Sequence, residues 1–156
     1  MIADEDIACA VPYTPCSVIN GYDWFLSSIR FGRMSSIIYS SLFTVSARLQ
    51  SHESYAKAIE HANHLLEDWR LSIPEQFRPR DCLPHMGRIS GSVARGIAVH
   101  THYLHVSMVV VLERLAMQVE RDHNQKKSHA YNLLLAARSI IEATRHIEIT
   151  PQTSTL

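Results

Sequence analysis

Apolar residues recur along most of this chain at steps of three and four, which is the spacing of one face of an α-helix. The first such stripe predicts a helix over about 23–50, and its members are Phe31, Met34, Ile38, Leu42, Val45 and Leu49. Asp23 stands where its side chain can cap the first turn. Phe25, Ile29, Ile37 and Phe43 lie elsewhere around this helix, so we expect it to contact more than one neighbour.

A second stripe predicts a helix over about 54–72, and its members are Tyr55, Ile59, Ala62, Leu66, Trp69 and Ile73. Charged and histidine side chains, His61 and His64 among them, make up the opposite, solvated face. Pro74 stops this helix because proline lacks the amide donor and clashes with the preceding turn. Three prolines and a glycine within 74–89 predict an irregular link.

Two further helices are predicted, over about 90–120 and 128–149, with a polar break at 122–127. The third helix is apolar on two sides, which indicates a central position; its two stripes are Val93, Ile97, His100, Leu104, Met108, Val111 and Leu115, and Val99, Tyr103, Val106, Val110 and Met117. On the fourth helix the apolar face is expected at Leu133, Ala137, Ile140, Thr144 and Ile147. Thr150-Pro151 ends that helix, and 151–156 form a polar tail.

Residues 1–21 are expected to form an extended arm, with Pro12 and Pro15 in it. Asn20-Gly21 is a hairpin dipeptide, but no alternating apolar pattern flanks it, so we expect no hairpin there. The predicted fold is therefore all-α, with a four-helix core over 22–150 that we interpret as part of a larger helical domain.

Composition narrows the class of protein. Hydrophobic residues make up 46% of the 156 residues, which is enough for a core. Lys plus Arg equals Asp plus Glu, at 15 each, so no overall field draws in nucleic acid or an anionic membrane. The three cysteines form no Cys-x-x-Cys, which favours a reducing, intracellular setting. The acidic start is unlike a signal peptide, and histidines and charges interrupt the most apolar helix, so no membrane association is expected.

Histidines supply the main candidate chemistry. His102 and His105 are one turn apart and could reach one metal ion. The competing interpretation makes His100 a hydrogen-bonded core histidine and puts His102 and His105 on a polar strip with Arg95 and Glu113. We favour the second, because two imidazoles without a nearby thiolate or carboxylate make a weak zinc site. His61 and His64 repeat the spacing but belong to the solvated face.

Other catalytic arrangements find little support. Only Glu120 and His123 have the Glu-x-x-His spacing of a di-iron bundle, and they fall at a helix end. Cys82 and His85 could form a thiol–imidazole pair, but no third orienting group is visible. Phosphate loops, dinucleotide fingerprints and nucleophile elbows are missing from the sequence. We therefore expect neither an enzyme nor a cofactor in this chain.

Trp69 has two interpretations. Tryptophan is enriched at binding hot spots, so it could anchor a partner. Its place on the stripe with Leu66 and Ile73 favours a core position.

Several phrases resemble, in order, the fungal-specific transcription factor domain, the middle homology region of zinc binuclear cluster regulators. The most informative is Leu66, Trp69, Ile73 and Pro74 in the pattern Leu-x-x-Trp-x-x-x-Ile-Pro, with Arg78-Pro79 soon after. The others are Asp4-Glu5-Asp6-Ile7 leading to Val11-Pro12, the helix around Ile37-Ile38-Tyr39, the run from Val99-His100 and Tyr103 to Leu112-Glu113-Arg114, and Ala136-Ala137 with Ile140.

The resemblance implies a nuclear regulatory segment of a protein acting in RNA polymerase II transcription, with partners among the other domains of the same regulator, other transcriptional proteins or a small effector.

The sequence departs from the family in three ways. Leu115 replaces the proline that usually follows the arginine, so the third helix should continue further. The zinc cluster that reads DNA is missing, so zinc is expected only in such a domain and this segment is not expected to bind nucleic acid. The family domain is longer at both ends, which leaves a fragment or a shortened relative. A metal carrier or enzyme using the histidines, and a plain protein-interaction module, stay open as alternatives.

Overall fold

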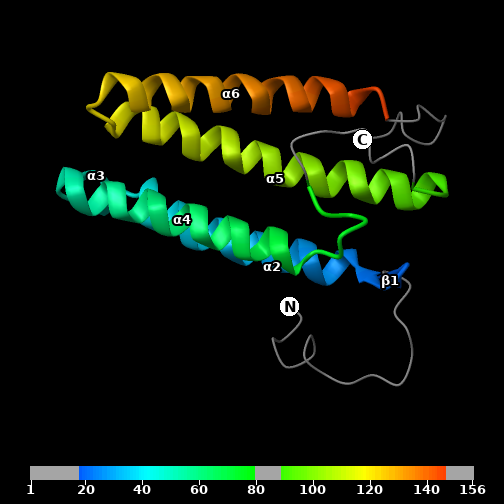
Figure 1. Cartoon of the computed structure of the whole chain (residues 1–156). Helices are drawn as coiled ribbons and strands as arrows, with labels where there is room; N and C mark the ends of the chain where they lie inside the picture. Colours follow the sequence, from blue (N-terminus) through cyan, green and yellow to red (C-terminus); the bar gives the residue numbers. More distant parts are fainter. Residues whose placement is uncertain (1–17, 80–88, 147–156) are drawn as a thin grey trace, which may run out of the picture.

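The computed structural model describes residues 18–79 and 89–146, and this part of the chain is an assembly of helices, as the periodicity predicts. The helices are α2 (Trp24–Leu42), α3 (Val45–Arg48), α4 (His52–Ser72), α5 (Ser92–Val119) and α6 (His123–Thr144). In Figure 1, α5 lies in the middle, with α6 along one side and α4 along the other, and α2 lies behind α4. The central position expected for the third predicted helix is confirmed.

The main core is built by α2, α4 and α5 together with the segment after α4. Ile38 and Leu42 of α2, Leu66 of α4 and Leu112 of α5 are each at most 3% exposed. No buried residue of α6 belongs to this cluster. Helix α6 instead packs Ala143 against Val99 of α5 in a separate, smaller cluster. The described helices thus form a three-helix core with α6 packed on the far side of α5.

The first predicted helix, over 23–50, is wrong as one continuous element. It ends at Leu42, and Thr44 takes an extended conformation in which its hydroxyl accepts a bond from the Ala47 amide at 3.3 Å and so caps α3. Neither proline nor glycine marks the break. Beyond it, Val45 and Leu49 are 78% and 83% exposed, so they do not continue the buried stripe.

A short hairpin replaces the last part of the expected extended arm. Strand β1 (Val18–Ile19) pairs antiparallel with β2 (Tyr22–Asp23). Asn20 and Gly21 both have positive φ, 51° and 76°, as a type I′ turn requires. The strands are two residues long, which is too short to show an alternating pattern. The remainder of the predicted arm, 1–17, lies outside the described residues.

Helices α4 and α5 begin within two residues of the predicted starts and end within one of the predicted ends. Helix α5 continues past Leu115 to Val119, as the missing proline implied. Four members of its predicted stripes are instead exposed, namely Val93, His100, Tyr103 and Val111.

Helix α6 differs from the prediction in both start and buried face. The Asp122 carboxylate accepts a bond from the Asn124 amide at 3.1 Å, so the expected polar break is the first turn of the helix. The residues buried toward α5 are Ala136, Ser139 and Ala143, whereas the predicted Ala137 and Thr144 are exposed. Small side chains let the two helices approach closely, so the buried face is not the one with the largest apolar groups. Ile147 and the polar tail lie outside the described residues.

Candidate functional site

An open groove of about 690 Å³ lies between α4 and α5, and its lining is mostly polar. The lining residues are Asn63, His64, Leu66, Glu67, Arg70, Pro79, His105, Val109 and Glu113. The α4 members recur at steps of three and four, and the α5 members recur every four residues, so each set forms one face of its helix. The groove follows from the way these two helices pack.

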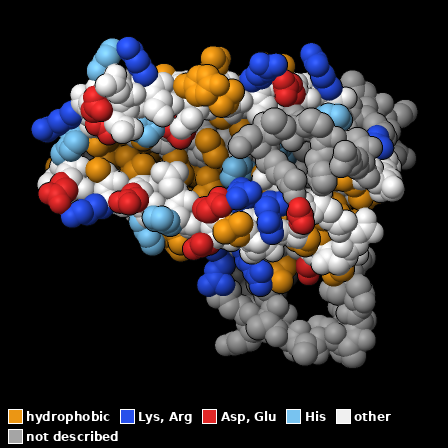
Figure 2. Space-filling view, viewed as in Figure 1, with side chains coloured by type: hydrophobic (Ala, Val, Ile, Leu, Met, Phe, Trp, Pro, Cys, Tyr) orange, Lys and Arg blue, Asp and Glu red, His pale blue; other side chains and the backbone are white. Residues whose placement is uncertain are grey.

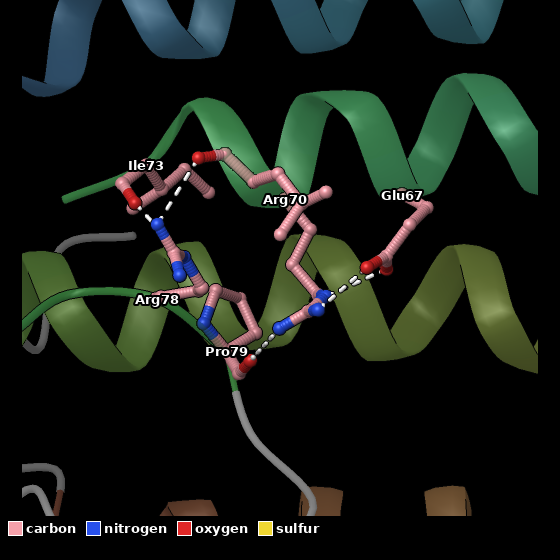
Figure 3. Close-up of polar contacts among 6 residues, drawn as sticks. Glu67, Arg70, Ile73, Arg78 and Pro79 are labelled. Carbon is pink, nitrogen blue, oxygen red and sulfur yellow. Dashed lines mark hydrogen bonds and ion pairs between the residues drawn. The ribbon is translucent and has the colours of Figure 1, made fainter. Parts of the chain in front are cut away.

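Arg70 organises one end of this groove (Figure 3). Its Nε and Nη2 donate to the two carboxylate oxygens of Glu67 at 2.7 and 2.6 Å. Its Nη1 donates to the carbonyl oxygen of Pro79 at 3.2 Å. The guanidinium therefore ties the groove wall to the segment that follows α4.

The same contact affects the pKa of Glu67. The hydrogen bond from Arg70 is the main cause that lowers the pKa of this carboxyl below its ordinary value, while partial burial acts in the opposite direction. Its side chain is about half exposed, so solvent weakens the ion pair. The groove therefore carries a fixed carboxylate near neutral pH.

Glu113 lies on the α5 wall and binds two side chains of α6. The Nδ1 atom of His129 is 2.6 Å from one carboxylate oxygen, and Asn132 donates to the other at 3.1 Å. His129 and Glu113 side chains are only 25% and 19% exposed. These contacts hold the start of α6 against α5 beside the groove.

The groove offers cationic and anionic groups but no nucleophile of the hydroxyl or thiol kind among its described lining residues. Its chemistry is suited to hold a small polar ligand through paired donors and acceptors, rather than to assemble a nucleophile with its base. A second groove of about 600 Å³ lies near the α2–α3 break and the end of α5, and it is more apolar, with Leu42, Phe43, Ala47 and Leu115 in its lining.

The residues of the Leu-x-x-Trp-x-x-x-Ile-Pro phrase occupy the core. Leu66, Trp69 and Ile73 are 3%, 6% and 1% exposed, so the core interpretation of Trp69 holds. The indole Nε1 donates to the carbonyl oxygen of Ser27 at 3.0 Å, and the ring meets that of Phe31 at a centroid distance of 4.8 Å.

The end of α4 is closed by the residues that follow it. After Pro74 the chain turns, and Arg78 donates to the carbonyl oxygens of Ile73 and Leu71, each at 3.1 Å (Figure 3). These acceptors belong to the last turn of α4 and the residue after it, where helix carbonyls lack internal partners. Phe77 stacks on Tyr22 of the hairpin at 5.0 Å, so the segment is also held from its other side.

The candidate histidines of α5 are placed differently from the interpretation favoured above. His102, not His100, is the buried one: it is 2% exposed, and its Nε2 lies 2.7 Å from the Ser139 hydroxyl of α6, while His100 is exposed. His105 instead lines the groove toward α4. The two imidazoles therefore lie against different neighbours. Over 18–79 and 89–146, no three His, Cys, Asp or Glu side chains come together as a metal site.

Some predicted residues lie elsewhere and some site residues were missed. Tyr103 is exposed on α5, and the Cys82–His85 pair lies outside the described residues. The roles of Arg70 and His129 were not predicted from the sequence. The spacing of Glu67 and Arg70, one helical turn apart, is the signal that could have found the first. His129 contacts a residue 16 positions away, which no local pattern indicates.

No protein-family model matches the chain, and no curated protein or solved structure is significantly similar to it. Within the described part, none of the helices combines the length and the hydropathy needed to cross a bilayer.

Proposed function

We propose that this chain is a regulatory helical segment of a fungal transcription factor that acts in RNA polymerase II transcription in the nucleus. In this proposal the chain does not itself read DNA. The observation that carries it is the resemblance of residues 66–74 and Arg78-Pro79 to the family phrase, because in the structure these residues form one connected unit at the end of α4.

Each residue of this phrase has a structural role in that unit. Trp69 fixes α4 against α2, Pro74 ends the helix, and Arg78 satisfies the carbonyl groups left at its end. Three other phrases that carry the resemblance lie on α2, α5 and α6, in the same order along the chain. The phrase at 4–12 lies outside the described residues.

The groove between α4 and α5 supplies a place for a small effector. A ligand shifts a regulatory equilibrium only by binding its two states with different affinity. Arg70 joins the groove to the segment after α4, so a ligand that competes for this guanidinium would favour a different arrangement there.

A reporter assay tests the proposal. The full chain is placed between an unrelated DNA-binding domain and an unrelated activation domain in a yeast nucleus, and a flexible linker of equal length is the reference. We expect the folded chain to lower reporter output severalfold, and Trp69→Ala, which disrupts the core, to relieve the effect. Equal output from the chain, the linker and the variant would contradict a regulatory role.

DNA binding gives an independent test. The chain has no net charge, so we expect only weak binding that disappears with added salt. Tight, salt-resistant binding of the purified chain to one duplex in an electrophoretic assay would refute the proposal.

A second candidate function is a protein-interaction module. The observation that favours it is the outward side of α6, which exposes large apolar side chains. A metal carrier has no comparable support in the described residues.

A further inference from the structure

Helix α6 carries large apolar side chains on the side that faces away from α5. Tyr131, Leu134, Leu135 and Ile141 are 60%, 66%, 44% and 66% exposed. The helix packs through small residues on its other side, where Ala136, Ser139 and Ala143 are buried. This arrangement reverses the usual orientation of an amphipathic helix, in which the larger apolar groups face the core. Large exposed apolar groups that gather on one side of a helix mark interaction surfaces.

Basic residues surround this apolar surface. The cations of residues 123–146, apart from histidines, are Lys126, Lys127, Arg138 and Arg145, and the single acidic residue is Glu142. The chain as a whole has equal numbers of acidic and basic residues, so the positive charge is local to α6. Figure 2 shows hydrophobic side chains between Lys and Arg side chains along the upper edge of the molecule, over α6.

Arg138 has a special place on this surface. It lies one turn after Leu134 and Leu135 and one turn before Ile141, and its side chain is 75% exposed. Its Nε donates to Glu142 at 2.9 Å, and a guanidinium carries further N–H donors that suit a carboxylate. A cation in the middle of the apolar stripe matches a partner that supplies an acidic side chain among apolar ones.

The charge pattern distinguishes the possible occupants. Two copies of this chain would bring basic faces together, which disfavours a symmetric α6–α6 contact. Insertion into a bilayer would bury the charged Arg138 together with the apolar groups around it, which is unfavourable. Helices that lie on membranes avoid this cost because their cations lie only at the borders of the apolar face. A DNA backbone matches the cations but leaves the leucine and isoleucine side chains without an apolar contact.

We propose that the outward side of α6 binds an acidic amphipathic helix of another protein segment. The apolar stripe from Tyr131 to Ile141 covers three turns, about 15 Å, so a partner helix of about three to four turns would cover it. Its apolar side would contact the stripe, and its carboxylates would meet Arg138 and the basic residues at both ends of α6. This inference does not depend on the proposed role in transcription.

The test uses a 16-residue helical peptide with a leucine and phenylalanine stripe and glutamates at the other positions, labelled for fluorescence anisotropy. A peptide of the same composition with the stripe scrambled is the reference. We expect micromolar binding of the first peptide and at least tenfold weaker binding of the second, with affinity that falls as salt rises.

Variants of the full chain locate the site. The double substitution Leu134→Ser with Ile141→Ser, and separately Arg138→Glu, should each weaken binding at least tenfold, while Leu71→Ser, an exposed leucine on α4, should leave it unchanged. Because these side chains are exposed, circular dichroism should report a folded chain in every case. Equal binding of both peptides, or equal binding by the α6 variants and the parent chain, would overturn the proposal.

Two further results would also overturn it in favour of another occupant. Stronger association with phosphatidylserine vesicles than with the peptide would indicate a membrane surface. A dimer in analytical ultracentrifugation that Leu134→Ser with Ile141→Ser dissociates would indicate that a second copy covers this face.

Discussion

Replacing Trp69 should reveal how much of the fold depends on the end of α4. The indole is 6% exposed, contacts the Phe31 ring and donates to the Ser27 carbonyl at 3.0 Å. Trp69→Ala removes the buried ring and leaves a cavity, which typically costs about 3–5 kcal/mol. Trp69→Phe keeps most of the apolar contact and loses the hydrogen bond. Because the Ser27 carbonyl can still accept the bond of its own helix, the loss should be about 1–2 kcal/mol.

These losses are large against the stability of a domain of this size. Natural domains are stable by about 5–15 kcal/mol, so Trp69→Ala removes at least about a fifth of the usual value. With a dependence on urea of about 2 kcal/mol per molar, the midpoint of unfolding should fall by about 2 M for alanine and by about 0.5–1 M for phenylalanine.

The assay is urea unfolding followed by circular dichroism at 222 nm. Leu71→Ala is the matched control, because this leucine lies two residues away on the same helix and is 50% exposed, so its loss should stay within about 0.5 kcal/mol. Ser27→Ala is a second control: its hydroxyl is buried without a hydrogen-bond partner in the described structure, so its removal should not destabilise the chain, and the carbonyl that accepts from Trp69 remains. If Trp69→Ala costs no more than Leu71→Ala, the indole does not anchor α4 and the reasoning fails.

Three further changes test separate contacts. Arg78→Ala should cost about 1–2 kcal/mol in urea unfolding, because two carbonyl oxygens at the end of α4 lose their donor, and Arg78→Lys should recover only part of it; full recovery would show that charge alone matters. The pKa of Glu67 is lowered in the folded state, so its pairing with Arg70 stabilises the fold at a pH above 4.5, the ordinary pKa of the carboxyl group. This stabilisation is lost as the pH falls through the folded-state pKa. The difference in melting temperature between the parent chain and Glu67→Gln should therefore shrink from pH 7 to pH 3, with an effect under about 1 kcal/mol for this half-exposed pair; a constant difference would contradict it. Gly21→Ala should cost about 1 kcal/mol in thermal unfolding because its φ of +76° strains any residue with a Cβ, although the space around it is open; an unchanged melting temperature would show that the turn adapts.

Long, regular patterns predicted the helices well, and short-range or tertiary features explain the errors. Helices α4 and α5 were predictable because their stripes are uninterrupted and Pro74 marks an end. The break before α3 depends on the side chain of Thr44, which caps α3 by a local hydrogen bond. The spacing of apolar residues carries no sign of such a cap. Asp122 is a similar case: it caps α6, although the polar residues around it are also typical of a loop.

The candidate site shows a different limit. Burial of Trp69, Leu66 and Ile73 follows from their common stripe, and periodicity alone predicts it. Periodicity cannot choose between His100 and His102, because that choice depends on which side of α5 is covered by α6. Ser139 and its small neighbours decide the matter by allowing close approach, and the buried imidazole then finds its partner there.

The bonds of Arg70 connect the Glu67 carboxylate with the backbone of Pro79, which lies in the segment after α4. Glu67 and Pro79 both line the groove, and Pro79 also belongs to the segment that Arg78 holds against the end of α4. A ligand anion in the groove would compete with Glu67 for this guanidinium, and a ligand cation would compete with Arg70 for the carboxylate. Either competition changes the third contact, with Pro79, because one rigid planar group makes all three bonds. In the proposed regulatory function, this side chain would couple binding in the groove to the position of residues 73–79.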